Sequence, residues 1–181
     1  MTLRALIAAA VLAASPGGAM AEDGMQDVTA EWRYVADGVM GGVSQGRLDR
    51  IVLDGRPAAR LTGQVSLDNN GGFIQLSTDF APDTAAFDAS GWTGLELDVQ
   101  GNGEIYEARV KTSQVTRPWQ SYRVAFTAPR DWATIRIPFA DLVPYRIDAP
   151  FDPAQLRRLG LVAVGRAFEV DLAVAALRLY R

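Results

Sequence analysis

Strict alternation of apolar and polar residues through the middle of the chain constrains its fold more than any other feature. From Leu95 to Gln100 every second residue is apolar, and the residues between them carry acidic or amide side chains. The same period of two recurs in residues 106–111, 121–126 and 132–139. Because successive side chains of a strand point to opposite faces, each run has one apolar and one polar face. Such runs are typical of antiparallel sheets that bury one face and expose the other.

Further strand and turn signals extend this pattern over the rest of the chain. Strands are predicted in residues 29–35, 47–53, 58–67, 72–78, 159–164 and 168–172. Asp54-Gly55 predicts a hairpin turn, and a shift of phase at Ala175-Ala176 predicts a β-bulge. Residues 138–153 contain four prolines and indicate a long connection, with a short helix capped by Asp152 at its end. We therefore predict an all-β sandwich of jelly-roll type, with about ten strands in a single domain over residues 29–181.

The first 21 residues have the three parts of a secretory signal peptide. Arg4 supplies a positive start, residues 5–14 form an apolar run, and Ala19-Met20-Ala21 provides the small residues of a cleavage site. The apolar run is shorter than the roughly 18 residues that a membrane span needs, so we expect no transmembrane segment after cleavage. We predict a signal peptide over residues 1–21, a flexible leader over residues 22–28, and a periplasmic or secreted mature protein.

Composition narrows the chemistry that the chain can perform. The chain contains no histidine and no cysteine, which excludes Ser-His-Asp and Cys-His nucleophiles and every site built on imidazole or thiolate. The formal net charge is −3 and no basic run occurs, which argues against a nucleic-acid partner. We expect a monomeric, non-enzymatic protein with no cofactor and no metal. Two alternatives without a diagnostic spacing stay open: a carboxylate hydrolase, and a calcium site with Asp37, Asp68 or Asn69 as ligands.

Two stretches, residues 37–46 and 66–73, combine glycine with short polar side chains. Glycine adopts positive φ without steric cost, and Asn and Asp bond to their own backbone, so both stretches predict tight, pre-shaped loops. Such loops either form only the turns at one end of the sandwich or direct backbone amides at a partner. The residues that we select as a candidate loop site are Asp37, Gly41, Gly42, Ser44, Asn69, Asn70 and Gly72.

The polar faces of the central strands offer a second candidate site. If these strands are neighbours, one surface carries Asp98, Arg109, Arg123 and Arg136, with Trp119 near its edge. An aromatic ring beside Arg and Asp can hold a sugar or a peptide, because the ring covers an apolar face while the charges bond hydroxyls or a carboxylate. The alternative is a solvated face of cross-strand ion pairs. The candidate groove residues are Asp98, Arg109, Trp119 and Arg123.

Four spaced motifs resemble those of the complex I intermediate-associated protein 30 family. They are Trp32 with DGVMGGVSQG at 37–46, GQVSLDNNGGF at 63–73, GLELDVQGNGEIY at 94–106, and the stretch 132–139. The resemblance covers the chain from Trp32 to Tyr180 and implies a jelly roll like that of galactose-binding domains. It also implies a chaperone that assists assembly of the membrane arm of respiratory complex I, and thus a protein partner such as a membrane-complex subunit. A glycan is the alternative ligand, and the signal peptide would place this chain across the membrane from the cytoplasm.

Overall fold

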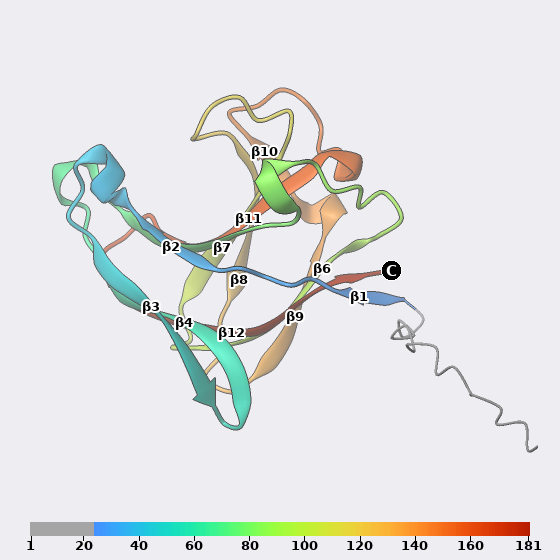
Figure 1. The fold of residues 1–181 in the computed structure, drawn as a ribbon. Helices are drawn as coiled ribbons and strands as arrows, with labels where there is room; N and C mark the ends of the chain where they lie inside the picture. The colour runs from blue at the N-terminus through green and yellow to red at the C-terminus, as the bar shows by residue number, and fades with distance from the viewer. Residues whose placement is uncertain (1–23) are drawn as a thin grey trace, which may run out of the picture.

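The computed structural model describes residues 24–181, so the predicted signal peptide (1–21) and the first residues of the predicted leader lie outside the described residues. Two six-stranded antiparallel sheets pack face to face as a sandwich (Figure 1). The helices among residues 24–181 are short 3-10 turns. None of these helices is long and apolar enough to cross a membrane. The prediction of an all-β sandwich is confirmed.

The strands divide between the sheets as follows. The first sheet contains, in order, β3 (Gln45–Leu53), β4 (Arg56–Val65), β12 (Phe168–Tyr180), β6 (Gly94–Gly101) and β9 (Ala133–Pro138), with β1 (Met25–Asp27) paired on β12. The second sheet contains, in order, β10 (Val143–Tyr145), β8 (Ser121–Thr127), β7 (Ile105–Thr112), β11 (Leu156–Val164), β5 (Phe73–Asp79) and β2 (Arg33–Ala36). The 3-10 helices are η1 (Asp37–Met40), η2 (Asp68–Asn70), η3 (Pro82–Thr84), η4 (Phe139–Asp141) and η5 (Pro153–Gln155).

Three local features occur where the sequence predicts them. Asp54 and Gly55 form the β3–β4 turn, and both have positive φ, 50° and 77° respectively. The pairing of β12 with β6 shifts between Val174 and Ala176, which is the predicted bulge. The Asp152 carboxylate accepts a hydrogen bond from the backbone N–H of residue 154 at 3.0 Å and so caps η5.

Two strands differ from the sequence analysis. Residues 22–28 are predicted as a flexible leader, but this is wrong for Met25–Asp27, whose backbone pairs with the end of β12. Their side chains show no alternation, so the pattern carries no signal for this pairing. β10 lies inside the predicted connection 138–153 and contains Pro144, which an edge strand tolerates because one side of its backbone has no ladder partner. The described chain therefore has twelve strands rather than about ten.

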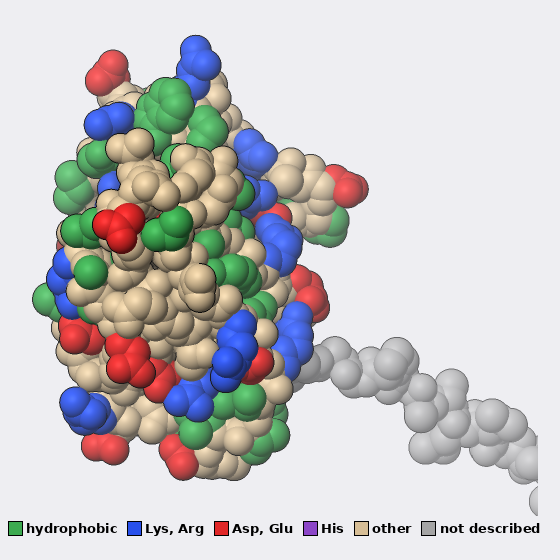
Figure 2. All heavy atoms as spheres, turned by 90° about the vertical axis from the view of Figure 1, so that its left-hand side faces the viewer, with side chains coloured by type: hydrophobic (Ala, Val, Ile, Leu, Met, Phe, Trp, Pro, Cys, Tyr) green, Lys and Arg blue, Asp and Glu red, His purple; other side chains and the backbone are tan. Residues whose placement is uncertain are grey.

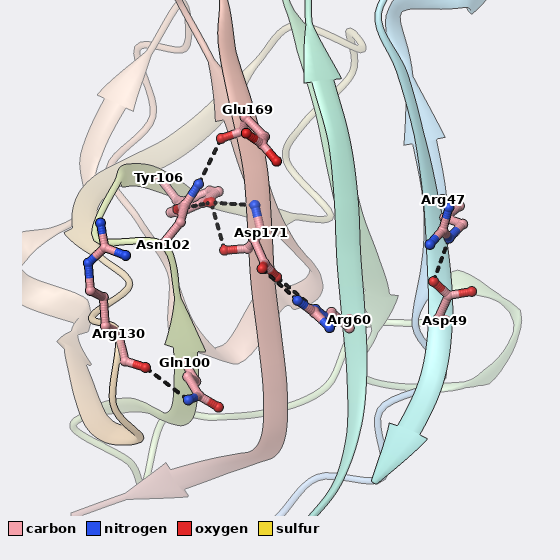
Figure 3. A network of polar contacts seen from close by, with 9 residues as sticks. All are labelled: Arg47, Asp49, Arg60, Gln100, Asn102, Tyr106, Arg130, Glu169 and Asp171. Atoms are coloured by element: carbon pink, nitrogen blue, oxygen red, sulfur yellow. Dashed lines mark hydrogen bonds and ion pairs between the residues drawn. The ribbon is translucent and has the colours of Figure 1, made fainter. Parts of the chain in front are cut away.

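Tyr106 connects the two sheets through a polar contact inside the core. It extends from β7 of the second sheet, and its ring lies 6.0 Å from the centroids of both Phe126 and Phe168. Its hydroxyl reaches β12 of the first sheet (Figure 3), 3.0 Å from the carbonyl oxygen of Asp171 and 2.9 Å from the Asn102 side-chain oxygen. The hydroxyl also accepts a hydrogen bond from the backbone N–H of Asp171. Burial raises the pKa of Tyr106, so the hydroxyl keeps its proton at neutral pH.

We predict that Tyr106→Phe lowers the free energy of unfolding by about 1–3 kcal/mol, because the ring stays packed while its buried polar partners lose the hydroxyl. Urea unfolding followed by tryptophan fluorescence measures this loss. Tyr180→Phe is the matched control, since Tyr180 is also buried but its hydroxyl makes no hydrogen bond within residues 24–181. Equal losses in the two variants would contradict a role for the Tyr106 hydroxyl.

Candidate functional site

Strand pairing brings the two glycine-rich loops together at one end of the sandwich. β2 pairs with β5 through Ala36 and Ile74, η1 follows β2 directly, and η2 lies just before β5. Figure 1 shows both loops on the left, beyond the ends of these strands. This end therefore holds the complete candidate loop site: Asp37, Gly41, Gly42, Ser44, Asn69, Asn70 and Gly72.

The buried carboxylate of Asp37 holds the two loops together. Asp37 is fully buried, and within its own loop Ser44 donates a backbone N–H (3.1 Å) and a hydroxyl (2.5 Å) to it. From the second loop, the backbone N–H groups of Gly72 (2.6 Å) and Phe73 (3.2 Å) donate to the same carboxylate. The Ser44 hydroxyl also accepts a hydrogen bond from the backbone N–H of Ser66 at 2.9 Å. We call this set of hydrogen bonds the Asp37 clamp.

The pKa of Asp37 follows from these contacts. Burial raises the pKa, but the hydrogen bonds from the Ser44 hydroxyl and from the backbone of Gly72, Phe73 and Ser44 outweigh burial. The pKa therefore lies below its ordinary value of 3.8, and the group is a carboxylate at neutral pH. The donors of the two loops compensate its buried charge.

Glycines next to the Asp37 clamp allow the backbone to approach the carboxylate. A Cβ on Gly42 would lie 2.4 Å from Asp37 Cγ, and a Cβ on Gly71 would lie 2.7 Å from Asp37 Oδ2. Both distances are shorter than non-bonded atoms tolerate. Asn69 and Asn70 have φ of 55° and 59°, the left-handed conformation that Asn adopts more readily than most residues. These candidate residues shape the loops.

The outward side of the two loops carries apolar side chains beside the exposed polar residues Asp68, Asn69 and Asn70. Four side chains on the loops are strongly exposed: Val39 (79%), Met40 (61%), Leu67 (52%) and Val43 (43%). We call these four residues the loop-end apolar surface. Figure 2 faces this end of the molecule and shows apolar side chains among backbone and uncharged polar atoms, with charged side chains mainly around the rim. The sequence analysis selected only the polar and glycine positions, although apolar residues inside glycine-rich loops were a signal for exposure.

Two of the four candidate groove residues, Arg109 and Arg123, lie on the outer face of the second sheet, and Trp119 lies in the loop that leads into it. Arg109 of β7 and Arg123 of β8 are opposite each other in the register. Glu107 contacts both, at 2.8 Å from Arg109 and 3.7 Å from Arg123. The Arg123 guanidinium lies 3.5 Å above the centroid of the Tyr145 ring. Trp119 is in the loop before β8, is 53% exposed, and its carbonyl accepts a hydrogen bond from Arg123 at 3.4 Å.

The prediction that Asp98 and Arg136 share this surface is wrong. Both lie on the first sheet, Asp98 on β6 and Arg136 on β9, because the chain crosses between the sheets after β6 and again after β8. Asp98 accepts a hydrogen bond from Thr134 at 2.7 Å and pairs with Arg178 at 2.8 Å. Arg136 and Arg178 both pair with the buried carboxylate of Glu96, at 2.9 and 3.0 Å. Here the alternative interpretation, cross-strand ion pairs on a sheet face, describes the structure.

Metal ligands do not cluster in the described chain. Within residues 24–181 no group of three or more acidic, His or Cys side chains lies close enough to hold a metal ion. Of the residues considered for calcium, Asp37 is engaged by the donors of its clamp.

We predict that Asp37→Asn lowers the free energy of unfolding by about 2–4 kcal/mol, because the amide NH₂ would face backbone N–H donors and one loop would lose its acceptor. Urea unfolding at pH 7 measures the change. Asp83→Asn is the matched control, since Asp83 is exposed in η3 and its side chain makes no hydrogen bond within the described residues. A loss no larger than that of the control would contradict the Asp37 clamp.

The pH dependence of stability tests the same group. Because folding lowers the pKa of Asp37, its contribution is fully present above the unfolded-state pKa of about 3.9 and is lost as the pH falls through the lower folded-state value. Between pH 7 and pH 3 the wild-type chain should therefore lose more stability than Asp37→Asn does. Parallel losses would show that Asp37 is not the group responsible.

Solved structures with the same architecture are carbohydrate-binding modules and parts of larger enzymes. The family 11 carbohydrate-binding module of Clostridium thermocellum, solved with a β-1,3-1,4-mixed-linked tetrasaccharide, has a TM-score of 0.67 at 14% identity, over 88% of this chain and 97% of that one. The family 30 module of a cellulosomal cellulase of Clostridium thermocellum has a TM-score of 0.59 at 18% identity, over 85% of this chain and 92% of that one. An agarase has a TM-score of 0.57 at 10% identity, over 87% of this chain and 24% of that one. These similarities confirm the jelly-roll β-sandwich.

The sequence comparison identifies the family. No curated protein matches the chain. The family model described as Complex I intermediate-associated protein 30 (CIA30) matches residues 23–174, which is most of the chain. This match agrees with the motifs of the two glycine-rich loops and the central strands, so the chain belongs to the CIA30 family.

Proposed function

We propose that this chain is an exported, non-enzymatic assembly factor that binds a protein partner through its loop-end apolar surface. One observation carries the proposal: the Asp37 clamp fixes two loops whose outward side chains are strongly exposed apolar residues. Exposed apolar side chains that gather at one place are typical of protein interaction sites. Val39, Met40, Val43 and Leu67 gather in this way at one end of the sandwich.

Rigidity makes this surface suitable for binding. Loops that are already fixed lose little conformational freedom when a partner docks, which improves affinity without adding contacts. The Asp37 clamp and the close approach of Gly42 and Gly71 provide that rigidity here. Met40 adds an unbranched, polarisable side chain, which adapts well to the surface of a partner.

Membership of the CIA30 family supports a subunit of a membrane complex as the partner. The family is described by its association with an intermediate of complex I, and the resemblance implies a subunit of a membrane complex as client. The predicted signal peptide over residues 1–21 supports export, so the proposed client surface is the part of a membrane complex that lies outside the cytoplasm. The monomeric state that we propose leaves the loop-end apolar surface accessible to this client.

We predict that the double variant Val39→Ser/Met40→Ser loses about tenfold or more of a membrane-complex subunit in co-purification from detergent-solubilised membranes, because two central apolar contacts are removed. Quantitative mass spectrometry of the captured subunit measures the loss. The matched control is Val52→Ser/Val143→Ser, which removes two equally exposed apolar side chains elsewhere on the sandwich (71% and 64%). Equal capture by both variants, with unchanged melting temperatures, would refute this binding surface.

A second candidate function is glycan binding on the outer face of the second sheet. Trp119 is exposed in the loop before β8, and its carbonyl accepts a hydrogen bond from Arg123, which lies opposite Arg109. An exposed aromatic ring near guanidinium groups can cover a sugar face while these groups bond its oxygens. The similarity in fold to carbohydrate-binding modules supports this candidate. It differs from the first in using a sheet face rather than the loop end.

For this second function we predict that at least one polysaccharide from a panel of neutral and acidic polysaccharides changes the tryptophan fluorescence of the wild-type chain. Trp119→Ala should abolish that change, because the stacking surface is lost. A panel without any response, confirmed by calorimetry, would exclude glycan binding.

A further inference from the structure

Unpaired positive side chains gather in a hollow where β7 ends and β11 begins, two neighbouring strands in the middle of the second sheet. The hollow has a volume of about 210 Å³ and lies between β7, the start of β11 and the loop 113–118. Its lining includes Lys111, Arg117, Arg157 and Arg158. Of these, Lys111, Arg117 and Arg157 form no ion pair with a residue of the described chain, whereas Arg158 pairs with Asp79 at 2.6 Å. We call this hollow the cationic pocket.

Several arginines on the outer face of the first sheet do have carboxylate partners. On the outer face of the first sheet Arg60 pairs with Asp171 at 2.6 Å, and Arg136 and Arg178 share Glu96. Figure 3 shows Arg60 on β4 directed at Asp171 on the neighbouring strand. Most arginines of the described chain have a carboxylate partner, whereas three cations without one lie together in this hollow.

The lowered pKa of Lys111 indicates a positive potential in the cationic pocket. Its Nζ donates a hydrogen bond to the carbonyl oxygen of Pro118 at 2.6 Å. Burial lowers the pKa of Lys111, and the charges of Arg158, Arg109, Arg123 and Arg157 lower it further. An anion placed here would relieve this repulsion. The chain as a whole has a formal net charge of −3, so the positive potential is local.

The wall of the cationic pocket is held in place before any ligand arrives. The Gln120 side-chain oxygen accepts hydrogen bonds from the backbone N–H groups of Thr116 and Arg117, both at 3.0 Å. The Gln120 side-chain nitrogen donates to the carbonyl oxygen of Arg146 at 2.9 Å. Gln120 thus braces the 113–120 loop against the segment that follows β10. Fixed loops of this kind are typical of binding sites.

We propose that the cationic pocket binds the carboxylate or sulfate group of an acidic polysaccharide whose adjoining sugar ring stacks on Trp119. The proposal rests on the second candidate function and names its substrate class. Arginine forks match the geometry of such oxyanions. At about 210 Å³ the pocket is smaller than the roughly 300–1,000 Å³ of whole-ligand sites, so it suits one charged group of a longer chain.

The surroundings favour a glycan over a lipid surface as the source of this group. Trp119 directly follows Pro118, which lines the cationic pocket, and Trp119 is 53% exposed. A polymer chain that lies across the sheet can reach both a hollow and a neighbouring ring. A flat membrane surface instead engages cations that protrude.

The test uses the mature chain and two forms of one polymer. Isothermal titration calorimetry compares polygalacturonate with its fully methyl-esterified form, which has the same backbone without the charge. We expect the acidic form to bind about tenfold or more tightly, and the double variant Lys111→Met/Arg157→Gln to lose this preference. Arg130→Gln is the matched control, because its side chain has no ion pair within residues 24–181 and lies outside the pocket lining.

The other outcomes separate this proposal from the second candidate function. Equal binding of both polymers, unchanged in the double variant, would overturn the cationic pocket and leave glycan binding intact. If neither polymer binds and no polysaccharide of the panel changes the tryptophan fluorescence, both the cationic pocket and the second candidate function are overturned. Two further probes are sodium sulfate alone and vesicles that contain phosphatidylglycerol. If only these probes bind the wild-type chain, and the double variant does not bind them, the polysaccharide is overturned as the source of the anion. Circular dichroism melting curves verify that each variant is folded.

Discussion

A buried carboxylate with a full set of hydrogen-bond donors determines the shape of the loop end. An isolated charge would be too costly to bury, and Asp37 is tolerated only because both loops supply donors to it. This requirement explains the composition of the two motifs. Gly42 and Gly71 allow the close approach, and Ser44 donates to the carboxylate while accepting from the other loop. Asp37 and Ser44 of the motifs are therefore buried inside the loops, and the apolar residues Val39, Met40, Val43 and Leu67 are exposed.

The sandwich gives this end its position and leaves a second surface elsewhere. Pairing of β2 with β5 sets the two loops side by side, and the Tyr106 hydroxyl connects the second sheet to β12 of the first. On the first sheet, Arg136 and Arg178 pair with Glu96. On the second sheet, Arg109 and Arg123 pair with Glu107, whereas Lys111 and Arg157 of the cationic pocket have no carboxylate partner within the described residues. The loop-end apolar surface and the cationic pocket thus have opposite chemical characters and are built from separate residues.

Period-two alternation predicted the strands well because it depends only on which face of a strand is buried. A shift of its phase placed the β12 bulge, and the Asp54-Gly55 dipeptide placed the β3–β4 turn; both are local events. It could not tell to which sheet a strand belongs, since residues on the polar face of β6 and of β7 look alike in sequence. This is why Asp98 was grouped with Arg109, although the chain crosses from one sheet to the other between them. Strand β1 was missed because its three residues show no alternation of apolar and polar side chains.

Hydrogen bonds and arginines keep several carboxyl groups of the described chain ionised. A carboxyl group that acts as a general acid at neutral pH needs a raised pKa. In the described chain, the carboxyl groups whose pKa departs from the ordinary value all have it lowered: Asp37, Asp79, Asp88, Glu96 and Asp98. For the buried Asp37 and Glu96, burial raises the pKa and hydrogen bonds or arginines outweigh it. Donors that hold a carboxylate ionised also hold it in place, so the contacts of Asp37 and Glu96 also stabilise the loops and the sheet that carry them.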